Sequence, residues 1–153
     1  MKKGNLLIVD DEAIILKTLK YNLSEYADAI YTAENGIEAI KRLAEYEIHC
    51  VICDINMPKM NGVEVIKDIR KNGNDVPFIF YTGHGNHELM MEAAKYGAFD
   101  FLDKPNLDGL EEVISRGLKE GFGEKKGIET NEDVLMSDYQ KMIEKIDDEK
   151  DKS

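Results

Sequence analysis

Five polar residues of this 153-residue chain have the types and spacing that phosphoryl-transfer chemistry needs: Asp10, Asp11, Asp54, Thr82 and Lys104. Three carboxylates brought together would repel one another and raise one another's pKa unless a hard cation lay among them. Mg²⁺ suits such a site, because it prefers oxygen ligands and combines one or two carboxylates with phosphate oxygens. Asp54 could then act as a nucleophile, with Lys104 and the metal neutralising arriving oxygens and Thr82 donating a hydrogen bond.

Five short apolar runs predict the strands that would position these residues. The runs are Asn5–Val9, Ala29–Ala33, Ile48–Cys53, Val76–Tyr81 and Ala98–Leu102, and helical apolar spacing follows each of them. The five polar residues all come at or just beyond the carboxyl end of a run, where open parallel sheets bind ligands. The alternation predicts an α/β fold, a doubly wound five-stranded parallel sheet with helices on both faces.

The motifs around these residues resemble the receiver domain of two-component response regulators. The matching segments are Leu7-Ile8-Val9-Asp10-Asp11-Glu12, Asp54-Ile55-Asn56-Met57-Pro58-Lys59-Met60-Asn61-Gly62, Thr82-Gly83 and Lys104-Pro105. The resemblance covers residues 4 to about 120, and several separated motifs in order are more specific than any one alone. It implies a flavodoxin-like (βα)5 fold with strand order 2-1-3-4-5.

The resemblance also implies a function, that of a phosphoacceptor switch in a two-component or phosphorelay system. Asp54 would accept a phosphoryl group from a histidine kinase or a histidine phosphotransfer protein, in a reaction that depends on Mg²⁺ as cofactor. Asp11, Asp54 and the backbone carbonyl of Asn56 would bind the metal directly, and Asp10 would act largely through water. The chain is not expected to be an enzyme beyond its own phosphorylation from a donor and its own dephosphorylation.

The remaining site residues follow from the same resemblance. Thr82 and the Gly83 amide would hold phosphoryl oxygens, Lys104 would pair with a third, and Pro105 resembles the family's cis proline, which would aim Lys104 into the site. Thr82 and Phe101 would be the switch residues that remodel the surface around the fourth helix and fifth strand. Phe101 has no hydroxyl, so its switching would rest on packing alone.

Two further positions resemble those that tune the lifetime of the phosphoryl group in this family. Asn56 stands two residues beyond Asp54, and His84 stands two residues beyond Thr82. The alternative for His84 is a histidine in a solvated loop. A metal pair of His84 with His87 is disfavoured, because no other Cys or His is placed to complete a tetrahedral site.

Charge and cysteine content exclude other classes of function. The net charge of −11 and the pI near 4.7 oppose binding to nucleic acid or to an anionic membrane surface. No apolar run approaches the length of a membrane span, so we expect a cytoplasmic protein. Cys50 and Cys53 lie three apart on a predicted strand and therefore point to opposite faces, which predicts two reduced core thiols.

The chain is predicted to divide into a receiver domain at 1–121 and a glycine-containing linker with an acidic tail at 122–153. The tail has ten acidic and six basic residues, and an apolar stripe indicates a short amphipathic helix at about 131–146. That helix could dock on its own receiver, pair with a second copy in a homodimer, or fold on a partner; a frayed charged tail is the alternative.

No segment is long enough for an output domain, and the output protein is unknown. The chain is therefore expected to be a stand-alone receiver without DNA-binding output, or else a fragment of a longer regulator or hybrid histidine kinase. A competing class is a small Mg²⁺-dependent phosphatase of the haloacid-dehalogenase type, whose nucleophile follows the first strand with a second Asp two residues on. Here Asp10 and Asp11 are adjacent and position 12 is Glu, which disfavours that class.

Overall fold

The five predicted strands form one parallel sheet. The computed structural model describes residues 2–83 and 87–130, with the backbone alone over 124–130. The elements are β1 (Asn5–Val9), α1 (Ala13–Asn22), the 3-10 turn η1 (Ser24–Tyr26), β2 (Ala29–Ala33), α2 (Gly36–Glu45), β3 (Cys50–Cys53), α3 (Gly62–Lys71), β4 (Phe78–Thr82), α4 (His87–Lys95), β5 (Asp100–Asp103) and α5 (Leu107–Thr130). The strand order is β2-β1-β3-β4-β5, so the predicted fold class and strand order are confirmed.

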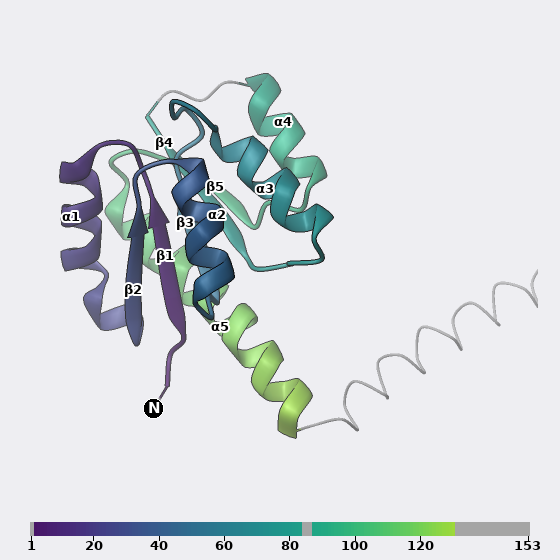
Figure 1. Ribbon diagram of the computed structural model, residues 1–153. Coiled ribbons are helices and arrows are strands. Elements are labelled where there is room, and N and C mark those ends of the chain that lie inside the picture. The colour runs from purple at the N-terminus through teal and green to yellow at the C-terminus, as the bar shows by residue number, and fades with distance from the viewer. Residues whose placement is uncertain (1, 84–86, 131–153) are drawn as a thin grey trace, which may run out of the picture. The chain divides into compact units, whose positions relative to one another are not determined.

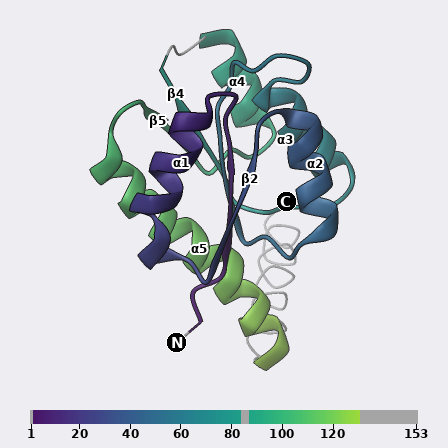
Figure 2. The ribbon, with the colours of Figure 1, turned by 60° about the vertical axis from the view of Figure 1, so that its left-hand side comes forward.

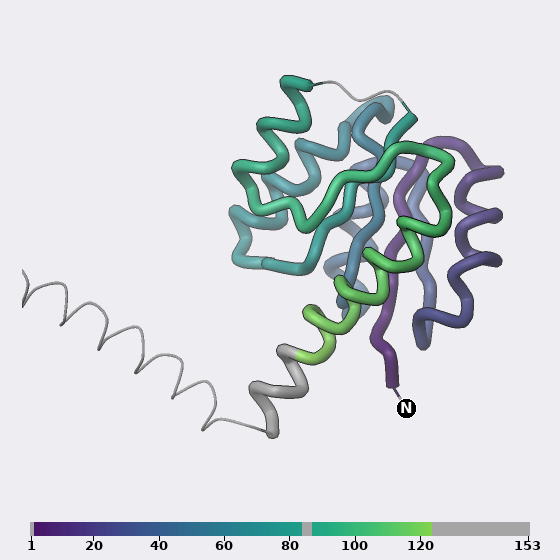
Figure 3. Tube along the Cα trace, turned by 180° about the vertical axis from the view of Figure 1, so that it is seen from behind, coloured from purple at the N-terminus to yellow at the C-terminus, as the bar shows by residue number. Residues whose placement is uncertain are grey.

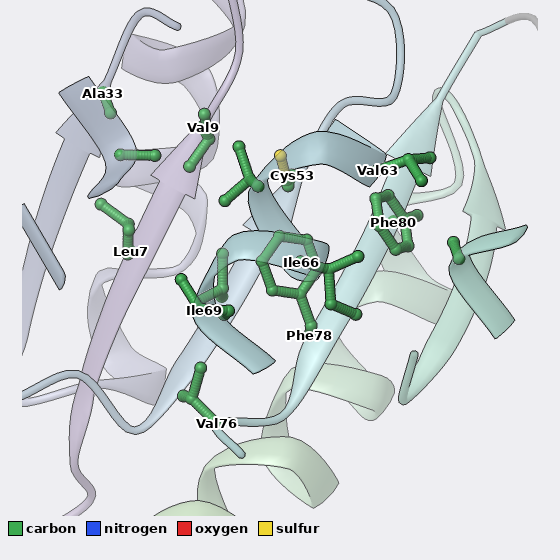
Figure 4. Packing of buried hydrophobic residues seen from close by; sticks show 14 of the residues in the cluster. Leu7, Val9, Ala33, Cys53, Val63, Ile66, Ile69, Val76, Phe78 and Phe80 are labelled. Carbon is green, nitrogen blue, oxygen red and sulfur yellow. The ribbon is translucent and has the colours of Figure 1, made fainter. Parts of the chain in front are cut away.

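Helices cover both faces of the sheet. The helices α2, α3 and α4 lie on one face, and α1 and α5 lie on the other (Figures 1 and 2). Seen from behind, α5 crosses the sheet on the face opposite α3 (Figure 3). Each face has its own apolar cluster, because the side chains of a strand alternate between the two sides. Figure 4 shows the cluster under α2, α3 and α4, with Phe78 and Phe80 of β4 at its centre.

The two cysteines illustrate this alternation. Cys53 belongs to the cluster under α3, and Cys50 belongs to the cluster under α5. Both are buried free thiols, and burial raises the pKa of each well above its ordinary value. The prediction of two unbridged core thiols on opposite faces of the sheet is confirmed.

Three strands begin two residues later than the apolar runs predict. The runs start at Ile48, Val76 and Ala98, whereas β3, β4 and β5 start at Cys50, Phe78 and Asp100. Ile48 and Val76 are nevertheless buried. Apolar residues that pack on the core just before a strand are therefore indistinguishable from the strand itself in the sequence. The described residues contain no helix that is both long and apolar enough to cross a membrane.

Helix α5 departs most from the prediction, because it continues through Gly121 and Gly123 to Thr130. The sequence predicts a domain boundary at Gly121 with a linker from 122 onward, but the lack of a side chain at Gly121 has a packing reason. A Cβ atom at Gly121 would collide with the carbonyl oxygen of His49. The compact unit that holds the sheet spans Met1–Phe122, and Gly123–Ser153 form a second unit. The domain division at 121 stays a prediction, and the helix predicted at 131–146 lies outside the described residues.

Candidate functional site

The register of the sheet brings Asp10 and Asp54 together. Val9, the last residue of β1, pairs with Ala33 of β2 and with Cys53 of β3. The amide of Asp54 donates to the Val9 carbonyl oxygen at 3.0 Å, and the amide of Asp10 donates to that of Ala33 at 3.1 Å. Asp10 and Asp54 therefore extend two neighbouring strands at the same edge, as their positions after two apolar runs predict.

Lys104 reaches both of these carboxylates from the loop after β5. Its amide donates to the carbonyl oxygen of Thr82 at 3.0 Å, which fixes the backbone beside the end of β4. The Lys104–Pro105 peptide bond is cis, as the sequence motif implies. The ammonium Nζ lies 2.6 Å from Oδ2 of Asp10 and 3.2 Å from Oδ2 of Asp54. One cation thus bridges two carboxylates at the centre of the site.

Burial and charge oppose each other in this trio. Asp10 is 2% exposed, and burial raises its pKa although hydrogen bonds from Lys104 and from the Glu12 amide lower it. For Lys104, burial lowers the pKa, but the carboxylates of Asp10 and Asp54 outweigh that effect, so its pKa is raised. The lysine is therefore charged at neutral pH and balances part of the buried negative charge.

Asp54 has one oxygen that the surrounding protein leaves unsatisfied. The residue is 7% exposed, and Oδ2 faces Lys104. Its other oxygen, Oδ1, is buried and accepts no hydrogen bond from any of the described residues. Leaving a buried carboxylate oxygen without a donor costs free energy, unless a cation or another ligand satisfies it. This oxygen fits a group that binds from outside the protein.

A cluster of three acidic residues lies at the same edge. One carboxylate oxygen from each of Asp10, Asp11 and Glu12 lies within 4.8 Å of the others. Asp11 and Glu12 are exposed, so water and ions can reach them. Glu12 was not among the predicted metal ligands, although its place directly after Asp11 was the available signal. An all-oxygen donor set next to a buried, unsatisfied carboxylate is the chemistry that Mg²⁺ prefers.

The loop after Asp54 is held by the start of α3. A Cβ atom at Gly62 would collide with the backbone carbonyl oxygen of Asp54, so only glycine allows α3 to begin this close to the site. Asn61 caps α3 by accepting from the Glu64 amide, and the Glu64 carboxylate accepts from the Asn61 amide. This reciprocal cap fixes the end of the loop that begins at Asp54. Asn56, two residues after Asp54, is exposed.

The structure also locates most of the other predicted residues. Thr82 is the last residue of β4 and is buried, and Gly83 follows it on the surface. Phe101 of β5 pairs in register with Phe80 of β4, and their rings stack with centroids 5.5 Å apart and planes 14° apart. Phe101 is partly buried and packs against the cluster under α3 and α4. His84 lies outside the described residues.

One contact of Lys104 was missed in the sequence. Its Nζ lies over the ring of Tyr81, 5.9 Å from the centroid, which is within range of a cation–π interaction. Tyr81 is 4% exposed, and burial raises its pKa. An aromatic residue next to Thr82 is explained equally well by strand propensity, so the sequence offers no separate signal for this contact.

Comparison with known proteins agrees with this geometry. The family model described as the response regulator receiver domain matches residues 6–115. Transcriptional regulatory protein FixJ of Bradyrhizobium diazoefficiens is 28% identical over 133 residues, which cover 86% of this chain and 65% of FixJ. Transcriptional regulatory protein GlrR of Escherichia coli is 33% identical over 120 residues, which cover 78% of this chain but 27% of GlrR. The chain thus spans less than two thirds of either relative.

Among solved structures, the chemotaxis protein CheY4 of Vibrio cholerae aligns with a TM-score of 0.68 at 28% identity. The alignment covers 74% of this chain and 98% of CheY4. The similarity therefore extends over nearly the whole of that protein, and the part of this chain that it leaves out is about a quarter of the sequence.

Proposed function

This chain belongs to the family of response regulator receiver domains, and we propose that it is a phosphoacceptor switch that is phosphorylated on Asp54 in a Mg²⁺-dependent reaction. The observation that supports this most directly is the buried Oδ1 atom of Asp54, which has no hydrogen-bond donor among the described residues. It lies in the carboxylate whose other oxygen faces the Lys104 ammonium. A carboxylate oxygen that accepts no hydrogen bond, beside a fixed cation, is well placed to attack an electrophilic phosphorus atom.

The proposed reaction takes a phosphoryl group from a phosphohistidine of a histidine kinase or a phosphotransfer protein. A carboxylate oxygen of Asp54 forms the bond to phosphorus, the phosphorus–nitrogen bond of the donor breaks, and its electron pair returns to the imidazole ring. Lys104 neutralises charge on the transferred oxygens. The Thr82 hydroxyl and the Gly83 amide donate hydrogen bonds to them, so the protein acts mainly by positioning and charge balance.

Mg²⁺ would be held directly by Asp11, Asp54 and the Asn56 carbonyl, with Asp10 acting largely through water and Glu12 adding negative charge at the same edge. When bound, it would neutralise charge on the phosphoryl oxygens. The acidic cluster and the unsatisfied Asp54 oxygen support this assignment, because both supply the oxygen ligands that Mg²⁺ prefers. Self-dephosphorylation takes place at the same site: a water oxygen forms a bond to phosphorus, the bond from phosphorus to the Asp54 oxygen breaks, and inorganic phosphate leaves the regenerated carboxylate. Asn56 and His84 are the proposed tuning residues of this step.

A protein donor is supported by the surface next to the site. Ile14 and Tyr21 of α1 are 72% and 83% exposed, the highest values among the large apolar side chains that the structure describes. They lie seven residues apart and hence on one side of α1, with Ile14 three residues after Asp11 and Tyr21 about two turns further along the helix. Apolar groups exposed beside a phosphorylation site suit contact with a partner protein.

The output is also a proposal. The relatives are transcriptional regulators by name and extend beyond the segment that this chain matches. We propose that phosphorylation changes the surface around α4 and β5 through Thr82 and Phe101, and that the changed surface is recognised by another protein or by a second copy of this chain. Neither nucleic acid nor a membrane is a proposed partner, because the net charge of −11 opposes both. A cytoplasmic location remains a prediction.

Intact-protein mass spectrometry after incubation with Mg²⁺ and a small acyl phosphate tests the proposal. We expect addition of one phosphoryl group to the native chain, and none to Asp54→Asn or in the presence of EDTA. Asp103→Asn is the matched control, because it removes an exposed carboxylate at the end of β5 and should still be phosphorylated. Repeated turnover of an external phosphomonoester without a stable adduct would instead support the phosphatase class.

A further inference from the structure

Lys104 contacts the end of β4 through its backbone amide and through its ammonium group. The Thr82 carbonyl oxygen accepts from the Lys104 amide at 3.0 Å. A Cβ atom at Gly83 would have the Cδ atom of Lys104 as its nearest neighbour, at 4.0 Å. The Nζ atom lies over the Tyr81 ring, 5.9 Å from its centroid. The end of β4 therefore contacts Lys104 at two points, the backbone amide and the ammonium group.

Tyr81 is well placed to hold its part of this contact still. It is 4% exposed and belongs to the apolar cluster under α1 and α5, together with Ile8, Ile79 and Leu110. Thr82 follows on the other face of the strand, and its contact with Lys104 is made by its backbone carbonyl oxygen. A ring buried in a close-packed core has little freedom to move, and its π face presents a fixed negative surface to the cation.

The other partners of the ammonium change during the proposed reaction. The Lys104 ammonium forms ion pairs with Asp10 and Asp54. Phosphorylation would alter the Asp54 carboxylate, and a bound cation would compete with the ammonium for both carboxylates. The contact with the ring depends on neither carboxylate. It can thus persist from the resting state to the phosphorylated state, whichever carboxylate partners the ammonium keeps.

We propose that Tyr81 is a positioning residue for Lys104, whose ring face holds the ammonium over Asp54 while its carboxylate partners exchange. This inference rests on the proposed phosphorylation of Asp54. It requires the aromatic ring but not the phenolic hydroxyl, so phenylalanine should replace Tyr81 and leucine should not. The proposal gives Tyr81 a role in the site in addition to its packing in the apolar cluster under α1 and α5.

The kinetic test compares variants at saturating Mg²⁺ with a small acyl phosphate as donor. Tyr81→Leu should lower the rate constant of phosphorylation about three- to tenfold, the range expected for loss of a partly desolvated cation–π contact. Tyr81→Phe should stay within about twofold of the native rate. Phe78→Leu is the matched control, because it makes the same aromatic-to-leucine change at a fully buried position on the same strand, on the opposite face.

A spectroscopic test does not require phosphorylation. In protein with labelled lysine, the ε-methylene protons of Lys104, assigned by their absence in Lys104→Met, should be shifted upfield by the ring current of Tyr81. The shift should persist in Tyr81→Phe and disappear in Tyr81→Leu. If no form of the chain is phosphorylated, the proposed function fails, and this shift still decides whether Tyr81 positions the lysine.

Several results would overturn the inference. One is an equal loss of rate in Tyr81→Phe and Tyr81→Leu, which would point to the hydroxyl. Another is an equal loss in Tyr81→Leu and Phe78→Leu at matched melting temperatures, which would point to general damage to the strand. A Tyr81→Leu protein with the native rate, or with an unchanged Lys104 resonance, would show that the ring does not hold the ammonium.

Discussion

Lys104 is the residue on which the electrostatics of the site depend. Its ammonium lies 2.6 Å from Asp10 and 3.2 Å from Asp54 and thereby separates two buried carboxylates that would otherwise repel each other. The ammonium thus lies between carboxylate oxygens of Asp10 and Asp54, where a divalent cation would also be favoured. The lysine and Mg²⁺ are therefore expected to compete for the same carboxylates, although both are needed for phosphoryl transfer.

Replacing the lysine tests this competition. Lys104→Met should raise the affinity for Mg²⁺, on the order of tenfold, because the metal no longer displaces a charge-assisted hydrogen bond and meets uncompensated negative charge. The same variant should be phosphorylated more slowly. Isothermal titration calorimetry with MgCl₂ measures the affinity.

The control for this prediction is Lys95→Met, which removes the charge of an exposed lysine on α4 and should leave Mg²⁺ affinity near the native value. An affinity of Lys104→Met equal to or weaker than that of the native chain would contradict the competition between lysine and metal.

The predictability of individual residues differed with their role. Asp10, Asp54, Thr82 and Lys104 were foreseeable because each is a polar residue where an apolar run ends, and the structure brings them to one edge. Tyr81 and Glu12 were not assigned roles. Tyr81 resembles any other buried strand residue, and the contact that distinguishes it comes from a loop 23 positions away along the chain.

At the scale of elements, Asp28 ties the start of β1 to the strand beside it. Its carboxylate accepts from the amides of Lys3 at 2.7 Å and Gly4 at 2.8 Å, and these hydrogen bonds lower its pKa below the ordinary value of 3.8. A lowered pKa means that the unfolded chain binds more protons in this range. Stability from Asp28 is therefore fully present above its ordinary pKa and is lost as pH falls through the lowered, folded-state value.

Asp28→Ala should therefore lower the melting temperature at pH 7, and the deficit relative to the native chain should shrink as pH falls below about 4, the ordinary range of an aspartate. Thermal unfolding followed by circular dichroism across pH measures the difference. Glu25→Ala removes an exposed acidic charge nearby without breaking the bonds to Lys3 and Gly4, and should show a smaller deficit. A deficit for Asp28→Ala that is constant with pH would contradict this assignment.

Two glycines of α5 give a second test at this scale. A Cβ atom at Gly121 would collide with the His49 carbonyl oxygen, whereas a Cβ atom at Gly123 would have no heavy atom within 4 Å. Gly121→Ala should lower the free energy of unfolding by about 1–3 kcal/mol, the usual cost of overpacking. Gly123→Ala should leave it unchanged or raise it slightly, because alanine favours helix.

Urea denaturation of the two alanine variants makes this comparison. Equal effects at both positions would mean that Gly121 is not selected by its contact with His49. The comparison also shows why the sequence did not predict the full length of α5. Both glycines are typical of a linker, and only the contact with His49, the residue before β3, distinguishes Gly121 from Gly123.

At the scale of the whole molecule, the two covered faces were predictable, because parallel strands need crossover helices and the apolar periodicities change at regular intervals. The order of the strands was predicted from the resemblance to receiver domains. The starts of β3, β4 and β5 were not, since core residues such as Val76 precede the paired segment. Residues 131–153 lie outside the described residues, so the docking of this segment and its pairing with a second copy remain predictions. The relatives' greater length likewise leaves the output of this chain as a proposal.

The central claim, that Asp54 is the phosphoacceptor, is tested most directly by locating the phosphoryl group. Borohydride reduces an aspartyl phosphate to homoserine, so the chain is treated with Mg²⁺ and an acyl phosphate, reduced at once, digested and sequenced by mass spectrometry. We expect homoserine at position 54 only, and none when Mg²⁺ is chelated. Homoserine at Asp10, Asp11 or another carboxylate in place of position 54 would contradict the account.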